Sequence, residues 1–274
     1  MNSRRGRPVN SRPYALAVPA MAAIISAFLA LPVVVIVYYA FSPSGLMVFP
    51  PKALTLHWFV NFFASGRFRG ALINSLLIAA LVTPASLGIA VPTAIALVRR
   101  DFAGRGALNA LILSPLIIPG VVSGVAFLNF FTWTGVTSGF WRIAIAMMCF
   151  TLPFAVRALV ATLHGLDGAL EEAGRNLGAR PWQAFLAITL PQLYPGLLAG
   201  GIFVFVEAID NFSIAVFLTD LRTTTLPVEA YGYIRDFDDP TIAALATILI
   251  AQSLILVFIL QRFVGMDRFL DLRR

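Results

Sequence analysis

The chain has 274 residues, of which 59% are hydrophobic and only 12% are charged. A soluble domain carries about 25% charged residues, so a water-soluble globular fold is excluded and one polytopic membrane domain is expected. The net charge of +7 does not indicate nucleic-acid binding, because 19 of the 20 basic residues are Arg. Most of them stand at the ends of apolar runs, where basic residues act as topology signals.

The N-terminal residues combine positive charge with a long apolar run. Four Arg residues precede or begin a stretch that is apolar from Tyr14 to Phe41. The apolar region of a signal peptide has about 7–15 residues, so this stretch is too long to be one. We expect residues 1–14 to be a cytoplasmic tail and the stretch itself to be a retained first membrane span.

Six apolar runs are long enough to cross a bilayer, which takes about 20 residues. They lie at about 15–41, 71–98, 108–132, 140–163, 196–219 and 241–263. Each is expected to be helical, because backbone groups in lipid must be hydrogen-bonded within the segment. Lys and Arg divide 14 to 6 between the two sides of these spans, which predicts both termini in the cytoplasm. The membrane domain would cover 15–264, followed by a cytoplasmic tail at 265–274.

Proline and glycine interrupt several of these spans. Proline inside a membrane helix is tolerated and often marks a kink. The prolines within the spans are Pro19, Pro32, Pro84, Pro92, Pro115, Pro119 and Pro153. In the third span, Gly120 and Gly124 form a G-x-x-x-G pair, a spacing that permits close helix approach.

Two segments between spans are expected on the outer side of the membrane. The first, about 42–70, contains the aromatic stretch HWFVNFF, which could form a short interfacial helix. The second, about 220–240, contains Asp236, Asp238 and Asp239, which we interpret as solvated loop charges because the ligand spacing of a known calcium loop is missing. No metal site is expected elsewhere, since Cys149 is single and the two His residues lie far apart.

A polar segment at about 164–195 separates the fourth and fifth spans and should face the cytoplasm. Leu170, Ala173 and Leu177 share one face of a predicted helix. Gly178 suits the left-handed position that ends a helix, and Pro181 suits the first turn of the next one. The sequence therefore predicts two short helices joined by a sharp bend at glycine.

This polar segment resembles the EAA loop of permease subunits of ATP-binding-cassette importers. That pattern has Glu-Ala-Ala, a Gly six residues after the Glu, and an Ile-x-Leu-Pro ending. The matching residues here are Glu172, Ala173, Gly178, Ile188, Leu190 and Pro191. The third position is Gly174 instead of Ala, which keeps a small residue but lowers helix stability by up to ~1 kcal/mol.

The resemblance implies an all-α membrane protein with the six-helix type I importer permease (MetI-like) fold, in the inner membrane of a bacterial cell. It implies that the helix before Gly178 is a coupling helix that docks on a nucleotide-binding ATPase subunit. The other implied partners are a second permease subunit, expected to be a paralogue, and a periplasmic or external solute-binding protein. An amphipathic helix lying on membrane lipid is the alternative interpretation of the segment.

Catalysis is not expected in this chain. It has no G-x-x-x-x-G-K-[ST] phosphate loop. The resemblance therefore implies that ATP and Mg bind to the ATPase subunit, and no cofactor is expected here.

Two acidic residues fall inside the fifth span. Glu207 and Asp210 are three positions apart, so they share a helix face. Because an isolated acid at the bilayer centre costs ~2.5 kcal/mol or more, we hypothesise that they line the substrate path with Asn211 and Ser213 and favour a cationic solute. The alternatives are a structural pair with an Arg of a partner permease, or a position nearer the membrane surface.

The C-terminal third resembles permeases of the spermidine/putrescine importer group. In that group an acidic pair precedes a Ser and a Phe, and a Leu-Pro stretch precedes the sixth span. The matching residues are Asp210, Ser213, Phe217, Leu226 and Pro227. Where the group tends to carry two adjacent Asp, this chain has Asp210-Asn211, so one negative charge is missing. Related importers handle iron, opines, aminobutyrate or phosphonates, so the exact substrate stays open.

Two functions of other classes compete with an importer permease. An ion-coupled secondary transporter usually shows inverted repeats and broken helices, and no repeat is visible in this sequence. A non-conducting membrane scaffold would not need two acids on one face of a membrane helix.

Overall fold

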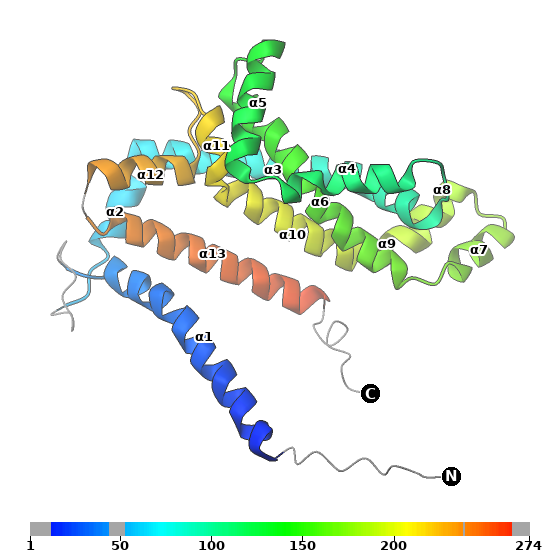
Figure 1. Ribbon diagram of the computed structural model, residues 1–274, viewed down its shortest axis with the longest axis horizontal. Helices are drawn as coiled ribbons and strands as arrows, with labels where there is room; N and C mark the ends of the chain where they lie inside the picture. Colours follow the sequence, from blue (N-terminus) through cyan, green and yellow to red (C-terminus); the bar gives the residue numbers. More distant parts are fainter. Residues whose placement is uncertain (1–11, 44–52, 238, 265–274) are drawn as a thin grey trace, which may run out of the picture. The chain divides into compact units, whose positions relative to one another are not determined.

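The computed structural model describes residues 12–43, 53–237 and 239–264, and the regular elements in these ranges are helices with no strand among them (Figure 1). The all-α prediction is thus confirmed. The expected tails, 1–14 and 265–274, lie largely outside the described residues. The chain divides into two compact units, residues 1–61 with 238–248, and residues 62–237 with 249–274.

The first unit is built on α1 (Arg12–Ala40), with the start of α2 (His57–Ala64) and the first turns of α13 (Thr241–Val264). Its small core contains Ala40, Ala243 and Ala244, with aromatic side chains packed around them. Trp58 Nε1 donates a hydrogen bond to the Ser42 carbonyl oxygen at 2.7 Å. The short helix expected at 57–63 is therefore present, and its Trp ties it to the end of α1.

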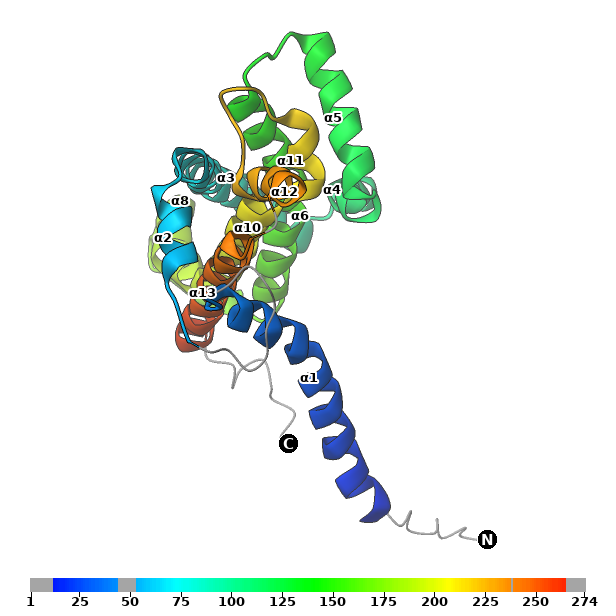
Figure 2. The same cartoon turned by 90° about the vertical axis from the view of Figure 1, so that its left-hand side faces the viewer.

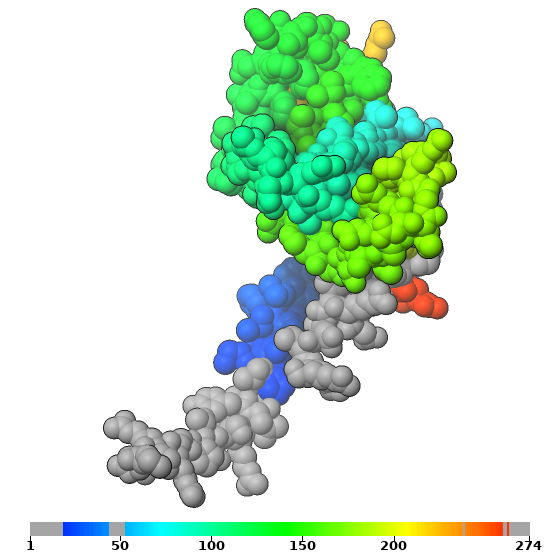
Figure 3. Space-filling view, turned by 90° about the vertical axis from the view of Figure 1, so that its right-hand side faces the viewer, coloured from blue at the N-terminus to red at the C-terminus, as the bar shows by residue number. Residues whose placement is uncertain are grey.

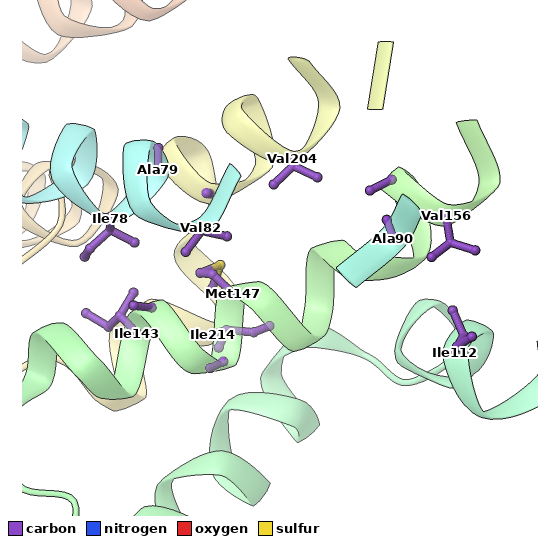
Figure 4. Close-up of a cluster of buried hydrophobic side chains, with 14 of the residues drawn as sticks. Ile78, Ala79, Val82, Ala90, Ile112, Ile143, Met147, Val156, Val204 and Ile214 are labelled. Carbon is purple, nitrogen blue, oxygen red and sulfur yellow. The ribbon is translucent and has the colours of Figure 1, made fainter. Parts of the chain in front are cut away.

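The second unit contains the other helices. In chain order they are α3 (Gly66–Arg99), α4 (Arg105–Ile117), α5 (Gly120–Thr134), α6 (Gly139–His164), α7 (Ala169–Asn176), α8 (Pro181–Ala184), a π turn (Phe185–Thr189), α9 (Leu190–Gln192), α10 (Tyr194–Asp210), α11 (Phe212–Leu218) and α12 (Leu226–Asp236). Helices α3, α6 and α10 run side by side and bury the main apolar cluster, part of which is shown in Figure 4.

Small residues let these three helices approach closely, as is common in membrane bundles. A Cβ placed on Gly196 would lie 2.5 Å from Thr162 Oγ1, and one on Gly200 would lie 3.2 Å from Ala155 Cα. Gly196 and Gly200 thus form a G-x-x-x-G contact between α10 and α6, which the sequence analysis missed although the spacing is visible in the sequence.

The third expected span, 108–132, is not one continuous helix. Helices α4 and α5 are bent by 108° at Ile118 and Pro119. Both residues have extended backbone angles, ψ 128 and ψ 135. Proline disfavours the helical conformation of the residue before it, so Pro119 ends α4 instead of only kinking the span.

The fifth expected span, 196–219, is interrupted as well. Helix α10 ends at Asp210, and Asn211 adopts an extended ψ of 105 before α11 begins. The Asn211 side chain accepts a hydrogen bond from the Ile214 backbone N–H at 3.0 Å. Asn is a favoured N-cap, so it starts a new helix at the point where the span was expected to continue.

Span counting therefore depends on how bent pairs are treated. Four helices in the described part of the chain are long and apolar enough to cross a membrane, at Pro19–Ala40, Gly66–Arg99, Gly139–His164 and Thr241–Ile259. The number rises to as many as six if each bent helix pair is counted as one span. These four correspond to the first, second, fourth and sixth expected spans.

Helix α5 packs on α11 through the predicted glycine pair. The position of a Cβ on Gly120 lies 3.0 Å from Ser213 Cβ. At Gly124 it lies 2.6 Å from the Phe217 ring and 3.2 Å from Ile214 Cα. The close approach expected from this G-x-x-x-G spacing is confirmed, and Figure 2 shows α5 standing beside α11.

Part of the segment at 220–240, expected to be a loop, is the helix α12. Its first backbone N–H, at Leu226, donates to Ser75 Oγ of α3 at 2.9 Å, and Asn74 Nδ2 donates to the Thr224 carbonyl oxygen at 3.2 Å. An ion pair of 2.7 Å joins Arg67 of α3 to Glu229. Polar side chains at the start of α3 therefore fix α12 in place.

The turn between α11 and α12 is fixed to α6 by a single carboxylate. Asp220 accepts hydrogen bonds from the backbone N–H groups of Gly139 at 2.6 Å, Thr223 at 2.7 Å and Arg222 at 2.9 Å. Gly139 begins α6, where free N–H groups favour a negative partner. Asp220 therefore joins the turn between α11 and α12 to the start of α6.

Replacing Gly124 by Ala is expected to destabilise the protein by about 1–3 kcal/mol, because the added methyl group would overlap the Phe217 ring and crowd the α11 backbone. Thermal unfolding of the detergent-purified protein measures this. The matched control is Gly88→Ala in α3, where a Cβ meets nothing within 4 Å and helix propensity gains up to ~1 kcal/mol. Equal unfolding of the two variants would contradict the close contact.

Candidate functional site

The segment with the EAA-like pattern folds as two short helices joined at a glycine. Helix α7 ends at Asn176, and Gly178 has a φ of +96. Glycine adopts this left-handed conformation without the strain that a Cβ would cause. Pro181 is the first residue of α8, a position where its missing N–H costs nothing. The predicted bend and both of its punctuating residues are confirmed.

The predicted apolar face of α7 is exposed. Leu170 is 53% exposed and Leu177 is 89% exposed, and Ala173 lies on the same side. Trp182 of α8 is 57% exposed. Figure 3 shows this segment at the surface beside the end of α3. In the chain as described, nothing covers these apolar side chains, so α7 presents a ready contact surface.

The second half of the pattern forms a π turn that leads into α10. The Leu190 backbone N–H donates to the Phe185 carbonyl oxygen, five residues earlier. In a regular helix the ring of Pro191 would crowd the carbonyl of Ala187, and a wider turn at this point relieves that contact. Such π turns occur often at functional sites. Leu190 and Pro191 open α9, and the chain then bends by 66° into α10.

The unusual Gly174 faces this π turn. A Cβ at Gly174 would lie 2.6 Å from Ile188 Cδ1. The third and the Ile positions of the pattern are therefore in direct contact. Gly174 leaves room for the end of the Ile188 side chain, so α7 and the π turn pack closely at this point.

Glu171, which the sequence analysis passed over, joins α7 to two other elements. Its Oε2 atom accepts hydrogen bonds from Arg99 Nη1, at the last residue of α3, and from Thr189 Oγ1, at the end of the π turn. The Thr189 residue is 2% exposed. Glu171 and Gly174 are three positions apart and form the inner face of α7. Glu172, the Glu of the pattern, is exposed.

The environment of Glu171 favours its ionised form. Hydrogen bonding from Thr189 lowers the pKa of Glu171 below its ordinary value of 4.5. Partial burial opposes this shift, whereas the hydrogen bond and charge of Arg99 and the charge of Arg175 add to it. The carboxylate is therefore a stable acceptor for both donors at neutral pH.

A polar hollow of about 510 Å³ opens between the end of α3 and α7. Its lining residues are Ile95, Arg99, Arg100, Gly168, Glu171, Glu172, Arg175 and Phe185. The Arg99 side chain meets Glu171 at this hollow, so the link between α3 and α7 is made by charged side chains.

The four expected path residues lie at the junction of α10 and α11. Asn211 Nδ2 donates to Glu207 Oε1 at 2.8 Å, and Ser213 packs against Gly120 of α5. Asp210 is partly exposed, but its Oδ1 atom is enclosed and has no hydrogen-bond partner among the described residues. The structure thus brings the four residues together but gives Asn211 and Ser213 packing and capping contacts, and leaves Asp210 with spare acceptor capacity.

Similarity to a known protein family identifies the class of protein to which the chain belongs. A family model described as a binding-protein-dependent transport system inner membrane component matches residues 86–266. The chain belongs to this family. The match covers α7, the π turn and α10, and the family is a transport component and not an enzyme.

Relatives and solved structures agree with this assignment. The spermidine/putrescine transport system permease protein PotC of Haemophilus influenzae is 28% identical over 87% of this chain and 92% of its own. The putrescine transport system permease protein PotI of Escherichia coli is 30% identical over 85% of each chain. A bacterial ABC transporter that imports the acidic polysaccharide alginate has a TM-score of 0.74 at 16% identity, covering 96% of this chain and 99% of its own. The permease thus shares the fold of importer permeases and resembles the polyamine type in sequence.

Replacing Glu171 by Gln is expected to destabilise the permease by about 1 kcal/mol at pH 7, since a charge-assisted acceptor is lost. Because the folded-state pKa is lowered, this difference should be complete above about pH 4.5 and should be lost as the pH falls through the lowered folded-state pKa. Thermal unfolding of both proteins at pH 7 and below pH 4 measures it. The control, Glu172→Gln, changes an exposed side chain and should unfold like wild type. A difference between Glu171→Gln and wild type that persists at low pH would contradict the assigned contact.

Proposed function

We propose that this chain is the transmembrane permease subunit of an ATP-driven importer in the bacterial inner membrane, with α7 as its coupling helix. The main observation is that α7, which contains the EAA-like pattern, has an exposed apolar face on one side and is held by contacts with the protein on the other side. Leu170 and Leu177 point outward, while Glu171 and Gly174 fix the opposite side. A helix supported on one face and bare on the other is suited to receive a partner and pass on its movement.

The proposed partner at α7 is a nucleotide-binding ATPase subunit, which would bind ATP and Mg. Because the chain has no phosphate loop, energy would come from that subunit. The family name supports a solute-binding protein as a further partner. A second permease, proposed to be a paralogue, would complete the path. With the EAA-like segment in the cytoplasm, both termini would lie there, and each bent pair would count toward six spans.

A polyamine or another small cationic solute is the proposed cargo. The named relatives PotC and PotI serve spermidine/putrescine and putrescine transport, and the two acids of α10 would give the proposed path of this chain a negative charge that suits a cation. Asp210 is the stronger candidate contact, because Glu207 already accepts from Asn211. An acid in a membrane helix is costly and is kept for function by default.

Changing Leu177 to Arg should reduce capture of a co-expressed ATPase subunit by roughly tenfold or more, as expected when an apolar anchor at an interface is replaced by a charge. Co-purification from detergent measures this. The matched control is Leu221→Arg, which alters a fully exposed Leu in the turn before α12, at the other end of the unit (Figure 1). Undiminished capture by the Leu177 variant would exclude α7 as the docking helix.

Charge reversal by Asp210→Arg should abolish uptake of radiolabelled putrescine into vesicles that contain the complete transporter. Capture of the ATPase should be unchanged, because Asp210 is the last residue of α10 and lies the full length of that 17-residue helix away from α9 and the π turn. The control Asp236→Arg reverses an exposed charge of α12 and should leave uptake intact. Transport by the Asp210 variant with unchanged selectivity would show that this carboxylate does not face the path.

A further inference from the structure

We propose that Glu171 and Arg99 are positioning residues that link the coupling helix to α3, so that movement of α7 is transmitted to the transmembrane bundle. With Thr189 they form a three-residue contact that we name the α7–α3 latch. The inference rests on the proposed function but assigns roles that the EAA-like pattern does not include.

The latch lies on the side of α7 away from the exposed apolar residues. Glu171 contacts Thr189 and Arg99, whereas Leu170 and Leu177 are bare. A partner that covers the apolar face would therefore leave the latch intact. Docking and transmission thus use different residues of one short helix.

Helix α3 is well placed to receive this movement. It has 34 residues, and at 1.5 Å per residue it is about 50 Å long. Arg99 is its last residue. Near its other end Arg67 binds Glu229 of α12, and Asn74 binds the turn just before α12. Along its length α3 packs on α6 and on α10, which carries Glu207 and Asp210. A displacement applied at Arg99 would therefore reach both the acidic pair and the opposite end of the unit.

The hydrogen bonds of the latch make it costly to separate α7 from α3. Two donors from different elements converge on one carboxylate oxygen, and one of them, Thr189, is buried. Loss of the carboxylate would leave that hydroxyl without its acceptor and Arg99 without its ion pair, which costs more than the loss of an exposed pair. The positive end group at the C-terminus of α3 is also favoured by the helix dipole.

The test uses the complete transporter in vesicles, with Glu171→Gln and Arg99→Gln as separate variants. ATP hydrolysis is measured with and without the external binding protein, together with uptake of radiolabelled putrescine. We expect both variants to retain the ATPase subunit and its basal hydrolysis. Stimulation by the binding protein and uptake per ATP should fall by roughly tenfold, the factor that corresponds to one lost charge-assisted hydrogen bond.

Two further variants separate transmission from simple loss of structure. The exchange Arg99→Glu with Glu171→Arg keeps the ion pair, and a Thr hydroxyl can donate or accept, so it should recover stimulation to within about twofold of wild type. Arg105→Gln removes the exposed Arg105–Asp101 pair at 2.7 Å and should change nothing. If Glu171→Gln does not fold, Arg99→Gln alone carries the test, since Arg99 is more exposed.

Each result has a defined meaning. Unchanged stimulation and unchanged uptake per ATP in both variants would overturn the latch. Loss of the ATPase subunit from both variants would also overturn it, because Glu171 would then serve docking. If the wild-type complex captured no ATPase, the proposed function itself would fail, which is distinct from either result.

Discussion

Close contact between helices through small residues is the constraint on which the rest of this structure depends. Lipid offers no hydrophobic drive for one apolar helix to pack on another, so shape complementarity and short polar contacts must supply it. Gly196 and Gly200 allow α10 to lie directly on α6, and Ser86 and Thr151 lie 3.4 Å apart between α3 and α6. The glycine contacts hold α10 on α6, and the Ser86–Thr151 contact joins α3, which ends at Arg99, to the same helix.

The breaks in the helices determine the positions of α5 and α11 as much as helix packing does. Pro119 separates α4 from α5 and turns α5 so that Gly120 and Gly124 meet α11. Asn211 ends α10 and caps α11 with its own side chain. The break at Asn211 leaves Asp210 at the end of α10. There one of its carboxylate oxygens has no hydrogen-bond partner among the described residues.

Local chemistry made much of this structure predictable. Gly178, Pro181 and the apolar face of α7 follow from backbone preference and helical period, and all three were found as expected. The break at Pro119 had a visible cause, but sequence alone does not say whether a proline kinks a helix or ends it. The partnership of Glu171 with Arg99, 72 positions earlier, was out of reach, because long-range pairing is set by how helices pack and not by spacing along the chain.

The departure at Gly174 shows how a motif and a structure constrain each other. Helix propensity alone favours Ala at this position by up to ~1 kcal/mol. The space that Ala would need is filled by Ile188 Cδ1, and the next residue, Thr189, binds Glu171. A methyl group at this position would require the end of the Ile188 side chain to move, since that is the atom in its way. Gly at this position therefore gives up helix stability but leaves the Ile188 side chain its place between α7 and the π turn, next to the carboxylate on which Arg99 and Thr189 converge.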